Sequence, residues 1–162
     1  LIGVRGGIAG DFTVTLLSDN EFMIIGSGMA ERYHQRFWNM VPMPQGVTFE
    51  SLTETMCGFN VAGPNSRELL KRLTNESLST KEFPFMRSKK IELAGVECVA
   101  LRVSFTGDLG WELHCDVSDQ QRLYKGLLET GKAFGAGPVG TRALMSLRIE
   151  KGYGSWSREY SP

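Results

Sequence analysis

The sequence predicts an α+β fold in which antiparallel sheets pack against helices. A hairpin pattern stands near the N-terminus, three strand patterns joined by short turns follow in the middle of the chain, and helical patterns lie between and after them. Of the 162 residues, 41% are hydrophobic and 22% are charged. This balance is typical of folded globular proteins rather than of disordered ones.

The first part of the chain combines a hairpin with a helix. Residues 11–17 are rich in Thr, Val and Phe, and the turn residues 18–20 separate them from the apolar run 22–25. Apolar residues then recur at helical spacing, which predicts a helix over 29–40.

A Pro-rich segment, 42–46, follows this helix and lacks apolar periodicity. We therefore place a boundary near Gly46. Residues 1–46 would be part of a small α+β subdomain that carries the strand of Asp11, and residues 47–162 would be a second α+β subdomain.

The second part begins with a strand over 56–62, after which Gly63-Pro64-Asn65-Ser66 opens a helix. Residues 90–93 and 96–105 flank Ala94-Gly95, which is a hairpin signal, and 111–117 follows a glycine-rich turn. Three consecutive antiparallel strands are therefore expected.

Two further helices are expected after these strands. Ser118 can cap the first, which runs through Leu128, and the second covers about 142–151, with Leu144, Met145 and Leu147 facing inward. The intervening residues 135–140 satisfy the letters GxGxxG, the pattern of a phosphate cradle. A dinucleotide fingerprint requires a strand before the first glycine, whereas a helical pattern precedes it here, so we interpret this segment as a helix-to-helix turn.

Charge and hydropathy disfavour two classes of partner. The 18 Lys and Arg residues balance 18 Asp and Glu residues, so the chain lacks the positive field that a nucleic acid partner would require. The longest apolar runs are shorter than the roughly 20 residues that a bilayer requires, so we expect no membrane partner. Cys57, Cys98 and Cys115 are odd in number and lie among strand-like residues, which favours reduced, buried thiols in a reducing compartment.

The two histidines give little support for metal or hydrolase chemistry. His34 falls on a predicted helix, and the side chains of His114 and Cys115 point to opposite faces of a predicted strand. A zinc site requires three or four convergent ligands, so no metal is predicted. A serine or cysteine hydrolase requires a nucleophile with a neighbouring base, and the sequence shows no such pair.

Three charged residues are candidates for a ligand site, each with a simpler alternative. Asp11 opens a strand after a glycine-rich stretch where a ligand could approach the backbone, or it is a solvated carboxylate. Glu112 lies among apolar neighbours and could accept hydrogen bonds from a flat heterocycle, or it is likewise a solvated carboxylate. Arg142 at a helix start opposes the helix dipole, so it either meets an anion or points into water.

Four segments, 7–14, 61–70, 104–113 and 142–153, together resemble the folate-binding aminomethyltransferase family, the family of the glycine cleavage T-protein. The stretches SFTGDLGWEL and SLRIEKGYGSW are specific to it, and the resemblance covers nearly the whole chain. Within the family, residues 150–156 are most similar to the C-terminal folate region of dimethylglycine and sarcosine dehydrogenases or oxidases.

The resemblance implies a T-protein-like, ferredoxin-like fold, here a fragment that lacks an opening segment and a C-terminal barrel. It implies tetrahydrofolate as the cofactor, with FAD only in a domain absent from this chain, and a mitochondrial matrix or bacterial cytoplasmic location. The catalytic aspartate of the family falls on Asp11. The folate-binding positions fall on Glu112, Arg142, Phe105, Ile25 and Ser27.

The implied activity is capture of a one-carbon unit from a small-molecule donor to form 5,10-methylenetetrahydrofolate, within an enzyme whose other domains are its partners. Three positions depart from the family pattern, with Gly10 in place of an aspartate, Phe105 in place of a tyrosine and Ser27 in place of an asparagine on the second strand. Two alternatives stay open: a folate-dependent demethylase or methyltransferase, and a non-catalytic regulatory relative.

Overall fold

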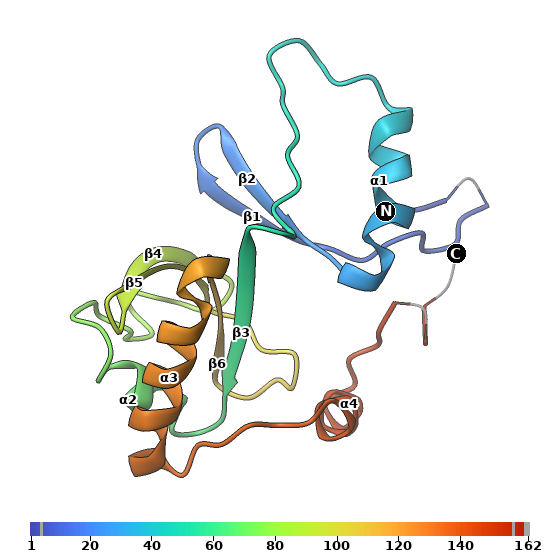
Figure 1. Cartoon of the computed structure of the whole chain (residues 1–162). Helices are drawn as coiled ribbons and strands as arrows, with labels where there is room; N and C mark the ends of the chain where they lie inside the picture. The colour runs from blue at the N-terminus through green and yellow to red at the C-terminus, as the bar shows by residue number, and fades with distance from the viewer. Residues whose placement is uncertain (4, 157, 161–162) are drawn as a thin grey trace. The chain divides into compact units, whose positions relative to one another are not determined.

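The computed structural model describes residues 1–3, 5–156 and 158–160, and the chain divides into two compact units. The first unit contains Leu1–Thr53 and the segment that begins at Gly154, and the second contains the residues between them (Figure 1). The division after Thr53 lies a few residues beyond the boundary expected near Gly46.

The segment after Gly154 was assigned to the second subdomain from sequence, but it packs with the first unit. The indole nitrogen of Trp156 donates a hydrogen bond to the carbonyl oxygen of Ile8 at 2.8 Å. The Trp156 ring also lies 4.8 Å from the His34 ring and 5.6 Å from the Tyr33 ring, measured between centroids. These contacts join residues that are far apart in sequence, so local patterns could not reveal them.

The first unit contains the predicted hairpin and helix. Strands β1 (Thr13–Ser18) and β2 (Glu21–Ile25) pair in antiparallel fashion, and a single 3-10 turn leads into α1 (Glu31–Met40). The hairpin and the helix are confirmed. His34 on α1 is buried, and burial lowers its pKa because the charged imidazolium loses hydration.

The second unit contains a four-stranded antiparallel sheet with the order β3-β6-β5-β4. Its strands are β3 (Met56–Ala62), β4 (Ser88–Leu93), β5 (Val96–Leu101) and β6 (Gly110–Asp116). The expected strand over 96–105 was too long, because the chain leaves the sheet after Leu101 and residues 102–109 form a loop. At this point the Arg102 guanidinium donates to the carbonyl oxygen of Phe83 at 2.9 Å.

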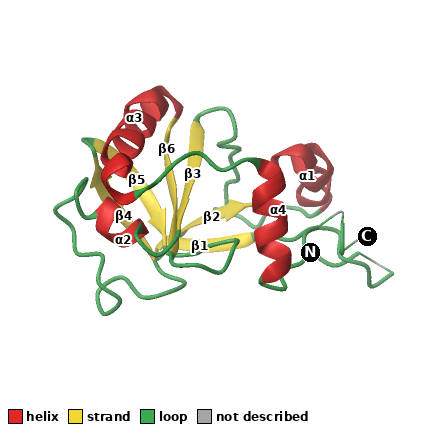
Figure 2. Ribbon diagram, turned by 90° about the horizontal axis from the view of Figure 1, so that it is seen from below, coloured by secondary structure: helices red, strands yellow, loops and turns green. Residues whose placement is uncertain are grey.

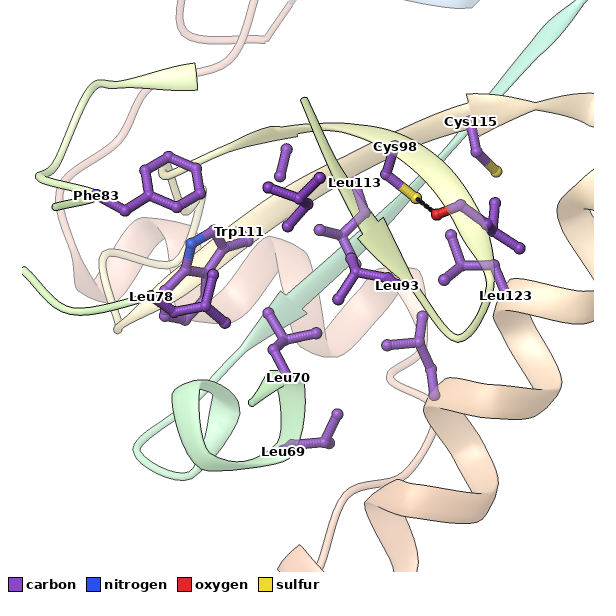
Figure 3. Close-up of a cluster of buried hydrophobic side chains, with 14 residues drawn as sticks. Leu69, Leu70, Leu78, Phe83, Leu93, Cys98, Trp111, Leu113, Cys115 and Leu123 are labelled. Carbon is purple, nitrogen blue, oxygen red and sulfur yellow. Dashed lines mark hydrogen bonds between the residues drawn. The ribbon is translucent and has the colours of Figure 1, made fainter. Parts of the chain in front are cut away.

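Helices α2 (Ser66–Leu70) and α3 (Gln120–Gly131) lie beside this sheet (Figure 2). Both helices supply leucines to the core. The alternating residues Trp111, Leu113 and Cys115 of β6 point into this core (Figure 3). They meet Leu123 of α3 and Leu70 of α2, both of which are fully buried. This core fixes which face of β6 remains available to other groups.

The start of α3 differs from the expectation in its cap. The backbone N–H and hydroxyl of Ser118 donate to the Asp116 carboxylate at 2.8 and 2.6 Å, so Asp116 rather than Ser118 caps the 3-10 turn that leads into α3. These hydrogen bonds lower the pKa of Asp116, because they favour its charged form.

The glycine-rich segment 135–140 connects the end of α3 and its following 3-10 turn to α4 (Thr141–Glu150). Gly135 has a φ of 70°, the left-handed conformation that commonly ends helices. The interpretation as a helix-to-helix turn is therefore confirmed.

The inward face of α4 was only partly predicted. Leu144 and Met145 are half-buried as expected, but Leu147 is exposed. Arg148, which was not expected to face inward, is buried, with an exposed fraction of 2%. The Arg148 guanidinium donates to the carbonyl oxygen of Tyr153 at 2.9 Å. A hydrogen bond of this kind offsets part of the cost of burying a charged side chain, which hydrophobic periodicity alone does not anticipate. Within the described part of the chain, no helix combines the length and the apolar character of a membrane span.

The core leads to a prediction about stability. The change Leu123→Ala removes a fully buried side chain between α3 and the sheet and should lower the free energy of unfolding of the second unit by about 2 to 5 kcal/mol. Hydrogen exchange of the β6 amides at increasing urea concentrations measures this loss. The exposed neighbour Gln121→Ala is the matched control on the same helix, and equal losses for the two variants would contradict the packing described.

Candidate functional site

The six residues expected to form the site are divided equally between the two units. Asp11, Ile25 and Ser27 lie in the first unit, and Phe105, Glu112 and Arg142 lie in the second.

Asp11 lies just before β1 and is exposed. The preceding Gly10 is buried, and a Cβ atom there would come within 2.7 Å of the Phe12 ring and 2.9 Å of Nε2 of His34. The missing side chain therefore gives room to two rings of the protein itself. The Asp11 carboxylate remains accessible at the end of this tightly packed segment.

Ile25 and Ser27 differ in their local setting. Ile25 is the last residue of β2, pairs with Thr13 and is half-buried. Ser27 lies outside β2, as the apolar run 22–25 predicted, and it is exposed in front of a 3-10 turn whose Ala30 N–H donates to its carbonyl oxygen. Gly26 and Gly28, on either side of Ser27, explain why the strand stops here, since glycine weakens strands.

Glu112 lies on β6, between Asn60 of β3 and Leu101 of β5. Because side chains alternate along a strand, Glu112 points to the face opposite Trp111 and Leu113. Its side chain is 22% exposed. The sheet thus holds a carboxylate in a fixed, partly dehydrated position on the face that the core does not use.

His114 shares this face with Glu112, and its Nε2 lies 3.6 Å from Oε2 of Glu112. A Cβ atom at Gly58 on β3 would come within 3.0 Å of Nδ1 of His114, so the imidazole lies directly against the backbone of the neighbouring strand. From the sequence, His114 was considered only for metal or hydrolase chemistry. Its spacing of two residues from Glu112 along a strand was the signal that could have identified it.

Phe105 lies in the loop 102–109 and is half-buried. Gly107 in the same loop has a φ of 75°, and the side chain of Lys151 passes so close that a Cβ atom there would overlap it. Glycine is therefore required at this position both by the positive φ and by the space that the Lys151 side chain occupies.

A hollow of about 420 Å³ lies beside this loop, and its lining includes Arg102, Ser104, Lys151 and Tyr153. Neither Phe105 nor Glu112 is among the described residues that line it. Arg142 is the second residue of α4 and is exposed. The second unit thus carries an acceptor on the sheet, an aromatic ring in a loop and a cation on a helix.

The cysteines are free, with Cys98 and Cys115 buried and Cys57 half-buried. In the part of the chain that the structure describes, no group of three or more His, Cys, Asp or Glu side chains is arranged to hold a metal ion.

Comparison with known proteins identifies the family of this chain. The sequence model of the GCVT N-terminal domain family matches residues 1–162. The chain belongs to this family. Its relatives include enzymes with two kinds of name, dehydrogenases of N-methylated glycines and aminomethyltransferases.

This GCVT-family chain is 34% identical to mitochondrial dimethylglycine dehydrogenase of Mus musculus over 157 residues, which are 96% of the chain but 18% of that protein. It is 29% identical to the aminomethyltransferase of Caldanaerobacter subterraneus over 156 residues, or 96% of the chain and 41% of the relative. The chain therefore spans only a small part of the length of the dehydrogenases that it matches.

The solved structure of heterotetrameric sarcosine oxidase from Corynebacterium sp. U-96 has the same fold. The two share 20% sequence identity with a TM-score of 0.62, and the match covers 83% of this chain and 66% of that one. The T-protein-like fold expected from the sequence is therefore confirmed for this GCVT-family chain.

The packing of His114 against Gly58 leads to a prediction. In Gly58→Ala the new methyl group should push the imidazole away from β3 and change its distance to Glu112. The chain has two histidines, so NMR spectra of the protein labelled at histidine can follow the ring signals of His114 and His34 separately. The His114 signals should shift while those of His34 stay. Gly137→Ala, where a Cβ meets nothing within 4 Å, is the control; unchanged His114 signals in Gly58→Ala would contradict the geometry.

Proposed function

We propose that this chain forms part of a tetrahydrofolate site at which a one-carbon unit is transferred. The observation that carries the proposal is the setting of Glu112, a carboxylate held by strand pairing on both sides, in a chain that matches the GCVT N-terminal domain family over its whole length. Relatives named aminomethyltransferase, dimethylglycine dehydrogenase and sarcosine dehydrogenase support this chemistry.

Glu112 fits the edge of a pterin ring. When ionised it only accepts hydrogen bonds, and a pterin edge presents N–H and amino donors. Its 22% exposure limits competition from water, which strengthens a charge-assisted hydrogen bond. His114 limits the positions that the carboxylate can adopt, since its imidazole is confined against Gly58.

The remaining candidate residues, each considered within its own unit, offer contacts of the kinds that a folate ligand uses. Phe105 offers an aromatic face for ring stacking in the second unit, and Arg142 offers an exposed cation that suits a carboxylate of the folate tail. In the first unit, Ile25 offers an apolar contact and Ser27 a small polar one.

We assign the catalytic role to Asp11. Tetrahydrofolate supplies two nitrogens, N5 and N10, that accept the one-carbon unit. The exposed Asp11 carboxylate orients these nitrogens and stabilises positive charge that develops on the donor. Transfer of this kind depends mainly on orientation, which lowers barriers by up to about 7 to 11 kcal/mol in well-oriented cases.

For the whole protein, we propose an enzyme similar to dimethylglycine or sarcosine dehydrogenases that forms 5,10-methylenetetrahydrofolate. FAD would then be bound outside this chain, in a domain that is its partner. We propose a location in the mitochondrial matrix or the bacterial cytoplasm, since the relatives include enzymes named as mitochondrial and an enzyme of a bacterium.

Asp11→Asn tests the catalytic assignment. The substitution keeps the size of the side chain and removes its charge, so folding should persist while one-carbon transfer falls roughly 10²- to 10³-fold. Formation of 5,10-methylenetetrahydrofolate by the full-length protein is the measurement. Asp19→Asn, at the exposed turn of the same hairpin, is the control, and full transfer activity in Asp11→Asn would exclude the assigned role. If the unmodified protein forms a methylated folate instead, the result favours the alternative of a folate-dependent demethylase or methyltransferase.

Glu112→Ala and Phe105→Tyr test the pterin site as a pair. Loss of the Glu112 acceptor should weaken tetrahydrofolate binding by roughly 1.5 to 3 kcal/mol. Phe105→Tyr keeps the ring face and adds a hydroxyl, so affinity should be equal or higher. Calorimetry on the full-length protein gives both affinities, with the exposed Glu129→Ala on α3 as control. Normal binding by Glu112→Ala would contradict the site, and a silent titration of the unmodified protein would favour a non-catalytic relative.

A further inference from the structure

Two thiols lie directly opposite each other on neighbouring strands of the second unit. The strand register pairs Cys57 of β3 with Cys115 of β6, and their sulfur atoms are 3.5 Å apart. Both side chains belong to the core-facing side of the sheet, where Cys57 packs at the margin and Cys115 lies within. The activity proposed above uses neither thiol.

We propose that Cys57 and Cys115 form an oxidisable dithiol, which a hydroperoxide converts into a disulfide between β3 and β6. This inference is independent of folate binding, because it concerns the opposite face of the sheet from Glu112 and His114.

The backbone geometry suits such a bridge. Directly opposed residues of antiparallel strands have Cα atoms about 4.5 to 5.5 Å apart, within the range of about 4.4 to 6.8 Å found in disulfides. Their Cβ atoms are about 4.5 to 5.5 Å apart, so these atoms must approach by up to about 1 Å. Such a bridge is reversible, because an external dithiol reduces it by thiol–disulfide exchange.

Accessibility sets the order of the two steps. Cys57 is half-buried, so an oxidant in solution can reach it, whereas Cys115 is 2% exposed. Burial, together with the contact to Cys57, raises the pKa of the Cys115 thiol to about 12, so it reacts poorly with a peroxide from solution. Its attack on Cys57 is favoured instead by proximity, because the two sulfur atoms are 3.5 Å apart. Cys57 is therefore the first thiol to react, and Cys115 is the resolving thiol held beside it.

The chemistry balances as a two-electron oxidation. The Cys57 sulfur attacks the peroxide, the O–O bond breaks, and a sulfenic acid and one water (an alcohol for an organic hydroperoxide) result. The Cys115 sulfur then attacks the sulfenic sulfur, gives up its proton, and releases a second water as the S–S bond forms. Both sulfurs are oxidised, and the peroxide is reduced.

Cys98 is the matched internal control. It is also buried in this core, but its sulfur is directed to the carbonyl oxygen of Val96 at 3.5 Å (Figure 3). Burial raises its pKa to about 11. We expect Cys98 to remain a thiol under conditions that oxidise the pair.

Peptide mapping tests the proposal directly on the full-length protein. Cleavage after Lys and Arg places the three cysteines on separate peptides, 37–67 for Cys57, 91–102 for Cys98 and 103–122 for Cys115. After treatment with hydrogen peroxide, unfolding and alkylation of free thiols, mass spectrometry should find peptides 37–67 and 103–122 linked, lighter by two hydrogen atoms than their sum. Peptide 91–102 should be fully alkylated, and dithiothreitol should restore the separate peptides.

Variants complete the test. Cys98→Ser should form the same linked pair, whereas Cys57→Ser should leave Cys115 alkylated and unoxidised after the same treatment, because the first thiol to react is missing. The proposal is overturned if Cys57 gains oxygen atoms while Cys115 remains alkylated in the unmodified protein. It is also overturned if peptide 91–102 takes part in the bridge, or if Cys115 is oxidised as readily in Cys57→Ser.

Discussion

The pairing of β6 with a strand on each side organises the second unit. β6 hydrogen-bonds to β3 over its whole length and to β5 at Glu112, Leu113 and His114, so these three residues lie between two neighbouring strands. One face buries Trp111, Leu113 and Cys115 against α2 and α3. Removing such side chains from water stabilises the fold by roughly 1.5 to 3 kcal/mol for each large apolar side chain. The opposite face holds Glu112 and His114 in register.

Glycines allow the close approaches that this arrangement requires. Gly58 leaves room for the His114 imidazole against β3, and Gly107 leaves room for the Lys151 side chain across the loop before β6. Gly110, at the start of β6, is equally confined, because a Cβ atom there would come within 3.0 Å of Ser104. The loop that carries Phe105 is thus confined at two points, by β6 at Gly110 and by the Lys151 side chain at Gly107.

Much of the fold could be predicted from local pattern. The two departures described next both involve an arginine side chain that donates to a backbone carbonyl oxygen. Strand 56–62 was predicted with the bounds of β3, because apolar periodicity and the following Gly-Pro turn agree locally. The strand expected over 96–105 ends at Leu101, and the guanidinium of the next residue, Arg102, donates to the carbonyl oxygen of Phe83. The inward position of Arg148 on α4 likewise depends on the Tyr153 carbonyl rather than on hydrophobicity.

The amino-acid sequence alone established the order of the elements, the α+β class, and the carboxylates and arginine worth testing, because these follow from periodicity, turn residues and motif. Tertiary structure decided which groups meet. The confinement of the His114 imidazole against Gly58, and the pairing of Cys57 with Cys115, follow only from the register of β3 with β6. Register between strands 58 positions apart is set by side-chain packing across the whole core, and no local stretch of sequence contains that information.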